Sequence, residues 1–138
     1  MVVSKKITLH STGNSDIIDI TSHVTSAVAD SNIQSGVITI FVCGSTAGVT
    51  TIEFEPGLVN DLQEMFEKLV PQSLDYKHNV RWEDYNGHSH LRASLMGASL
   101  TVPFSQRKLM LGTWQQIVVV DFDTRPRSRE LVLQIMGE

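Results

Sequence analysis

Three of the five histidines, His78, His88 and His90, lie within thirteen positions in a stretch rich in Asp, Asn and Gly. A His-x-His pair with a third imidazole nearby could bind a divalent metal ion, zinc or magnesium, if the rings are neutral. In a helix, His88 and His90 would point about 200° apart. Asn86-Gly87 instead favours a turn followed by extended chain, which lets the rings converge. The spacing equally fits ordinary loop histidines.

Arginines alternate at Arg125, Arg127 and Arg129, with a proline after the first. Proline favours an extended backbone, so the three guanidinium groups could share a face. Arginine forks fit phosphate and carboxylate oxygens. The alternative, favoured by these residues alone, is a turn whose arginines pair with Asp121 or Asp123.

A segment of small residues, Gly44–Gly48, joins two expected strands. Its backbone N–H groups and the hydroxyls of Ser45 and Thr46 could approach an anion. The segment lacks the Gly-Lys-Ser/Thr ending and the following helix of a P-loop. A tight connection between strands is therefore the favoured interpretation in isolation.

Two further sites have weaker patterns. Glu53 and Glu55 lie on one face of an expected strand, where they could hold a cation or act as acid and base, although exposed strand carboxylates are common. Gly112 interrupts a long apolar segment and indicates a bulge, beside which Trp114 could line a pocket. A purely architectural bulge fits the same residues.

The hydrophobic periodicity predicts the elements that would position these residues. We expect a helix that begins at Thr21 or Ser22 and a second that follows Pro56-Gly57 and ends before Pro71. The first two strands are expected to form a hairpin. This α+β pattern, with a mostly antiparallel sheet or β-sandwich and two or three helices, excludes a doubly wound nucleotide-binding fold. Six or seven strands are expected, within residues 5–10, 17–20, 37–43, 49–55, 99–104, 109–123 and 130–136.

The composition restricts the classes of partner. At 138 residues the chain is expected to form one domain, 1–138, and its net charge of −4 gives no general attraction to nucleic acid or anionic membranes. No signal peptide or membrane-spanning segment is expected. One cysteine excludes an intrachain disulfide and fits a reducing compartment, so we expect a cytoplasmic location.

Several short motifs, in this order and spacing, resemble those of the YjbQ-like family, also called the secondary thiamine-phosphate synthase family. The resemblance covers nearly the whole chain and is strongest from Gly36 to Glu138. Its most specific parts are Leu69-Val70-Pro71, Tyr76-Lys77-His78, His90 to Gly97, Ser99 to Pro103 and Leu111 to Gln115.

The resemblance implies an α+β fold with a seven-stranded sandwich and three copies around a threefold axis. It also implies a histidine-lined pocket at the subunit boundaries that accepts a metal ion and an anionic ligand. The associated activity is weak joining of hydroxymethylpyrimidine diphosphate to thiazole phosphate. The resemblance leaves open whether this condensation is the main activity or a side activity.

The chain departs from the family at Gly44, where many relatives carry histidine. His78 and His90 match the family's other two histidines, and His88 looks additional. Either His88 replaces the missing imidazole, which we favour, or metal binding is weakened or absent.

The leading hypothesis is a small homotrimeric enzyme that acts on a small phosphorylated substrate. The alternatives are a non-catalytic protein that binds a metal or a phosphorylated metabolite, and a metal-dependent phosphoester hydrolase. The residues assigned to the enzyme are His78, His90 and Glu53 for catalysis, His78, His88 and His90 for the metal, and Ser45, Thr46, Trp114, Arg125 and Arg127 for the phosphorylated ligand.

Overall fold

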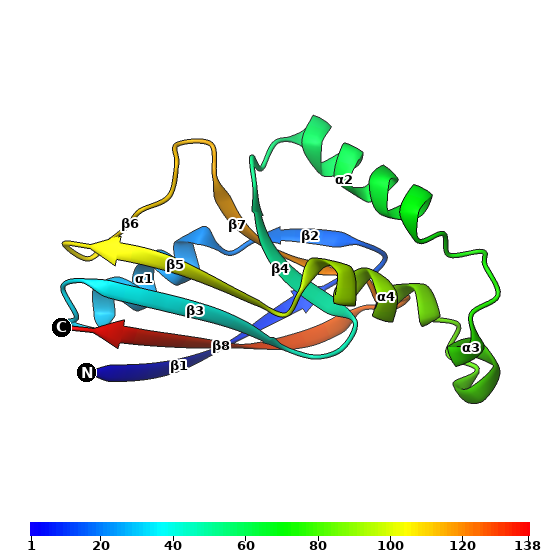
Figure 1. Cartoon of the computed structure of the whole chain (residues 1–138), viewed down its shortest axis with the longest axis horizontal. Helices are drawn as coiled ribbons and strands as arrows, with labels where there is room; N and C mark the ends of the chain where they lie inside the picture. Colours follow the sequence, from blue (N-terminus) through cyan, green and yellow to red (C-terminus); the bar gives the residue numbers. More distant parts are fainter.

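The computed structural model describes residues 1–138, which form two antiparallel sheets and four helices (Figure 1). The α+β class and the antiparallel pairing are confirmed. Eight strands form rather than seven, because the expected strand 109–123 divides in two. In spatial order, the five-stranded sheet contains β1 (Val2–Ser11), β8 (Arg127–Gly137), β3 (Gly36–Cys43), β5 (Ser99–Ser105) and β6 (Lys108–Leu109), and the three-stranded sheet contains β2 (Asp16–Asp19), β7 (Gln116–Asp121) and β4 (Ala47–Ile52).

Both helices expected from the sequence are present, as α1 (Thr21–Asp30) and α2 (Pro56–Leu69). Glu55 does not extend the preceding strand, which ends at Ile52. Its carboxylate instead caps α2 by accepting hydrogen bonds from the backbone N–H groups of Gly57 and Leu58. None of the helices has the length and apolar character needed to cross a membrane.

The expected hairpin between the first two strands is wrong. β1 pairs with β8 and β2 pairs with β7, so the two strands belong to different sheets. The turn between them was correctly placed, but Gly13, Asn14 and Ser15 all have positive φ, at 75°, 54° and 66°. Their left-handed backbone carries the chain from one sheet to the other. The backbone N–H groups of Asn14 and Ser15 fix it there by donating to the carbonyl oxygens of Asp123 and Asp121.

The core has two parts, one on each face of the three-stranded sheet. The larger part lies between this sheet and the five-stranded sheet, and Ile117 and Val119 of β7 face it together with α1. The smaller part contains Val118 and Val120 of β7, and Phe66 of α2 packs edge-on against Phe122 there, with ring centroids 4.8 Å apart. Because both faces are covered, β7 is a continuous apolar run rather than an alternating one.

A buried ion pair joins the two sheets. Arg129 of β8 donates from Nε and Nη2 to the two carboxylate oxygens of Asp121 on β7, at 2.8 Å each. Ser11 of β1 also donates to Asp121, and Arg129 donates to Thr46 in the connection between β3 and β4. Burial alone would raise the pKa of Asp121, but the hydrogen bonds from Arg129, Ser11 and the Asp123 backbone hold it below the ordinary value.

We expect Asp121→Asn to lower the free energy of unfolding by about 3–5 kcal/mol, because it leaves the Arg129 guanidinium buried without its carboxylate. Asp30→Asn, which breaks an exposed pair with Lys5, should cost about 0–1 kcal/mol.

Since the folded pKa of Asp121 is lowered, its ionised form stabilises the fold fully above about pH 4, and this stabilisation is lost as the pH falls further. Urea unfolding across an acid pH series measures both effects. Equal losses in the two variants would contradict a structural role for the buried pair.

Candidate active site at the start of α4

The histidine-rich segment, expected to be a loop, forms two helices, α3 (Lys77–Trp82) and α4 (Gly87–Met96). The carbonyl oxygen of Asn86 accepts from the N–H groups of Ser89 and His90, which starts α4 directly after Asn86. Gly87 is needed for close packing and not for a turn, because a Cβ there would lie 2.5 Å from Cβ of Tyr76. The expected extended step through His88 and His90 is therefore wrong.

The structure brings His78 and His90 together. Their ring centroids are 4.4 Å apart with the planes tilted by 58°. His78 lies on α3 and His90 in the first turn of α4, so the packing of these two helices places the rings in contact. Both side chains are partly buried.

Asn86 fixes the orientation and the tautomer of His78. Its amide nitrogen lies 3.3 Å from Oδ1 of Asp123 and donates to that carboxylate, so its amide oxygen faces Nε2 of His78 at 3.0 Å. An amide oxygen can only accept, which places a proton on Nε2. In the neutral ring, Nδ1 of His78 then carries a lone pair that can bind a metal ion or accept a proton.

His90 makes no hydrogen bond through its ring nitrogens. Burial and the neighbouring His78 ring lower the pKa of His90, and the more distant carboxylates of Asp123 and Asp84 oppose this only in part. A lowered pKa keeps the imidazole neutral at pH 7, the state needed by a metal ligand or a general base.

Two open pockets meet at His90. One, of about 450 Å³, is also lined by His78, Lys77 and Leu91. The other, of about 380 Å³, is also lined by Ser45 and by the small residues Gly44, Ala47, Ser94 and Gly97. The structure therefore places the Ser45 hydroxyl in a pocket next to the histidine pair.

His88 does not join the pair. Because the two residues lie on one helix, about 200° apart, His88 faces a different cavity, beside Arg92 and Glu67. The expectation that His88 replaces the imidazole missing at Gly44 is not met within the chain, and no group of three His, Cys, Asp or Glu side chains could hold a metal ion. The pKa of His88 is lowered by burial and by Arg92.

Gly44 is constrained by the buried arginine. A Cβ at this position would lie 2.7 Å from Nη1 of Arg129, which the carboxylate of Asp121 and the hydroxyl of Thr46 hold in place. A histidine at position 44 would therefore require Arg129 to move. The small residue at position 44 is thus matched to the closely packed arginine.

Two of the expected phosphate ligands, Arg127 and Thr46, have structural partners instead. Arg127 pairs with Asp123, and Arg129 with Asp121, as the turn interpretation predicted. The Thr46 hydroxyl is buried and donates to Asp123. Of the three alternating arginines, only Arg125 makes no ion pair. It lines a cavity of about 180 Å³ next to Asn86 and Asp123.

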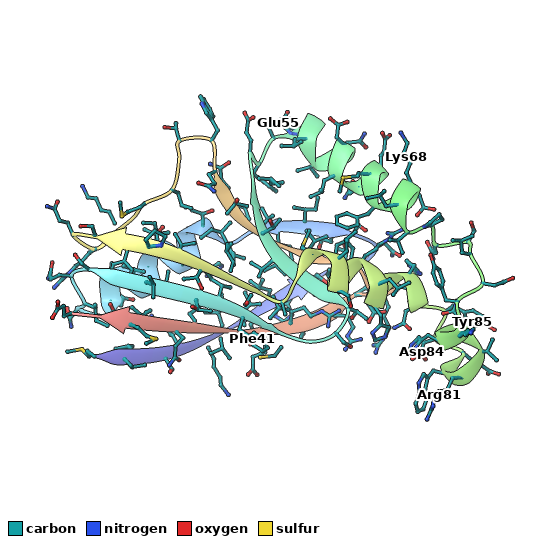
Figure 2. The ribbon with its side chains drawn as sticks, viewed as in Figure 1. Phe41, Glu55, Lys68, Arg81, Asp84 and Tyr85 are labelled. Atoms are coloured by element: carbon teal, nitrogen blue, oxygen red, sulfur yellow. The ribbon has the colours of Figure 1, made fainter.

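Glu53 and Trp114 lie outside the pockets at His90. Glu53 follows the end of β4, close to Glu55, which Figure 2 shows at the opposite end of α2 from α3. Trp114 is 72% exposed in the connection between β6 and β7. The single chain therefore brings neither residue to the histidine pair.

A family model described as UPF0047 protein YjbQ-like matches residues 5–138. The chain belongs to the YjbQ-like family. A UPF0047 protein from Methanothermobacter thermautotrophicus is 36% identical over 137 residues, covering 99% of this chain and 94% of the relative. One from Archaeoglobus fulgidus is 37% identical over 131 residues, covering 95% and 99%.

Solved structures agree with this assignment. A YbjQ-like protein of unknown function from Sulfolobus solfataricus superposes with a TM-score of 0.95 at 34% identity, covering 100% of this chain and 99% of that one. An uncharacterised YjbQ/UPF0047 protein from Clostridium acetobutylicum has a TM-score of 0.88 at 34% identity, covering 96% and 99%. The fold is thus that of the YjbQ-like family.

Sequence reasoning missed Asn86 and Asp123 as residues of this candidate site. Asn86 was interpreted as a turn former and Asp123 only as a possible arginine partner. The amide–carboxylate bond joins residues 37 positions apart, so no local pattern predicts it.

Replacing His78 should raise the pKa of His90. The protonated His78 ring disfavours a second positive charge, so neutral Gln in His78→Gln removes one cause of the lowered pKa. The pH dependence of the His90 ring signals in NMR spectra measures the change. His10→Gln, on β1, is the control and should leave the His90 titration in place. An unchanged or lower His90 pKa in His78→Gln would contradict the coupling.

Proposed function

We propose that this chain is a small enzyme that acts on a phosphorylated small molecule, with His78 and His90 as its catalytic pair. The observation that supports this most directly is the chain of contacts from Asp123 through Asn86 to His78, whose ring touches His90 beside two open pockets. A base whose orientation is fixed by a hydrogen-bonded partner is a common arrangement in acid–base catalysis.

The two imidazoles would have different roles. His90, with its lowered pKa and free ring nitrogens, is unprotonated at neutral pH and would accept a proton. His78, whose Nε2–H is held by Asn86, would present its Nδ1 to the substrate. Lys77 and the Ser45 hydroxyl line the two pockets and would bind phosphate oxygens.

A divalent metal ion would fit the pair only in part. Two neutral imidazoles can supply two nitrogen ligands, which suits zinc better than magnesium, and the remaining ligands would come from the substrate, water or a second copy of the chain. A bound ion would neutralise charge on a diphosphate leaving group.

The reaction to test first is the condensation of hydroxymethylpyrimidine diphosphate with thiazole phosphate, which the family resemblance suggests. Purified protein would be incubated with both isotope-labelled substrates, with and without added zinc or magnesium. We expect His90→Ala and His78→Ala to lower the rate about 100-fold or more, and the exposed control His23→Ala to leave it unchanged. Condensation that survives both substitutions would refute the site. Tight substrate binding without product would instead favour a sequestering protein.

We also propose that the chain forms a homotrimer whose interface includes the outer face of α4. Leu91 and Leu95 lie one turn apart on this helix and are 50% and 61% exposed, and Leu91 lines the His78 pocket. Exposed apolar side chains grouped in this way are typical of interfaces. A neighbouring copy seated there would close the pocket and could add ligands to it.

Light scattering coupled to size-exclusion chromatography tests the assembly. We expect a mass of three chains, and a mass of one chain for Leu91→Glu with Leu95→Glu, because two charges would be buried at the interface. Met65→Glu, an exposed position on α2, is the matched control and should stay trimeric. A monomeric parent protein, or a trimer that survives the double substitution, would contradict the proposal.

A further inference from the structure

A second cavity lies on the side of α4 away from the His78–His90 pair. Its volume is about 200 Å³, and all seven residues that line it are polar. His88 and Arg92 of α4 form one wall, Glu67 of α2 lies opposite, and Asn14 and Ser15 border it from the connection between β1 and β2. This site is independent of the function proposed above.

His88 supplies an unpaired buried donor. The side chain is 2% exposed, and its Nδ1 has no hydrogen-bond partner. Nε2 lies 3.4 Å from the hydroxyl oxygen of Ser89, which is fully buried and has no other partner. The Ser89 hydroxyl has no other acceptor within reach, which favours the tautomer in which Ser89 donates to Nε2 and the ring proton is on Nδ1. A buried N–H without an acceptor is costly and indicates a missing ligand.

Arg92 supplies a fixed guanidinium. It is 5% exposed, and its Nε donates to the carbonyl oxygen of Val70 at 3.0 Å while Nη1 donates to Oγ of Ser15 at 3.2 Å. These two bonds hold the group in place without using all of its donors. The Ser15 hydroxyl accepts from Arg92 but donates to no group in the chain, which adds another free donor to the cavity.

Glu67 is the only carboxylate that meets these donors. It pairs with Nη2 of Arg92 at 2.6 Å, yet its side chain is 56% exposed. Because α2 presents Glu67 from the solvent side, the carboxylate can swing outward without disturbing the core. A second anion of similar geometry could then take its place on Arg92.

The backbone at the rim is also unusual. Asn14 and Ser15 both adopt left-handed conformations, which non-glycine residues rarely do. Such conformations gather at binding sites, where the surrounding structure holds them. The conformation places the side-chain amide of Asn14, which makes no hydrogen bond within the chain, at the edge of the cavity.

We propose that this cavity binds a small tetrahedral oxyanion such as phosphate, held by Arg92, Nδ1–H of His88 and the Ser15 hydroxyl, and that Glu67 occupies the site when the anion is absent. Phosphate and Glu67 thus compete for one guanidinium group.

The test follows inorganic phosphate binding by NMR, through the Nε–Hε signal of Arg92 and the ring signals of His88. Glu67→Gln should bind phosphate about tenfold more tightly than the parent, because a neutral amide competes less well for the guanidinium. Glu64→Gln, which removes an exposed carboxylate one turn earlier on α2, should change the affinity by less than about twofold. His88→Leu should weaken binding about tenfold, and His88→Asn, which retains a donor near Nδ1, should weaken it less.

Binding at the proposed catalytic pair is distinguished by a His78→Ala, His90→Ala variant, in which the Arg92 signal should still respond to phosphate. The proposal is overturned if the Arg92 signal does not move at millimolar phosphate in Glu67→Gln. Equal affinities in Glu67→Gln and Glu64→Gln would also overturn it. So would a crystal structure of Glu67→Gln, grown with phosphate, that holds only water in the cavity.

Discussion

The buried ion pair between Asp121 and Arg129 is the interaction on which both sheets and the candidate site depend. It joins β7 to β8 across the sheets and reaches β1 through Ser11. Two residues along, Asp123 extends the same hydrogen-bonded network to Asn86 and so to the ring of His78. Loss of the ion pair would therefore disturb the orientation of His78 as well as the packing of the sheets. Stability and site geometry rest here on one set of polar contacts.

Elements with a strong local pattern were predicted well. The β-branched run of β3 and the amphipathic pattern of α2 each specify an element without help from distant residues. Predictions were wrong where contacts between distant residues determine the local structure. The turn before β2 is real, but its left-handed backbone leads into another sheet. Asn86-Gly87 has the composition of a turn, yet Gly87 is there because α4 packs closely against Tyr76.

The residues of the candidate site were likewise predicted correctly in part and wrongly in part. His78 and His90 were identified through a family resemblance, and the structure places their rings in contact. His88 was grouped with them by spacing alone, and the helix separates it from them. Arg127 was assigned to phosphate and instead holds Asp123, because a carboxylate buried beside it needs a partner. No sequence pattern predicts the polar cavity at Arg92, since its residues come from the β1–β2 connection, α2, the segment after α2, and α4.

Helix α4 carries His88 and His90 on nearly opposite sides of its axis. A rotation of the helix about that axis would move the two imidazoles in opposite directions. Any ligand that drew His88 further into its cavity by such a rotation would also shift His90 against His78. A rotation of this one helix would therefore affect both pockets, although they share no lining residue.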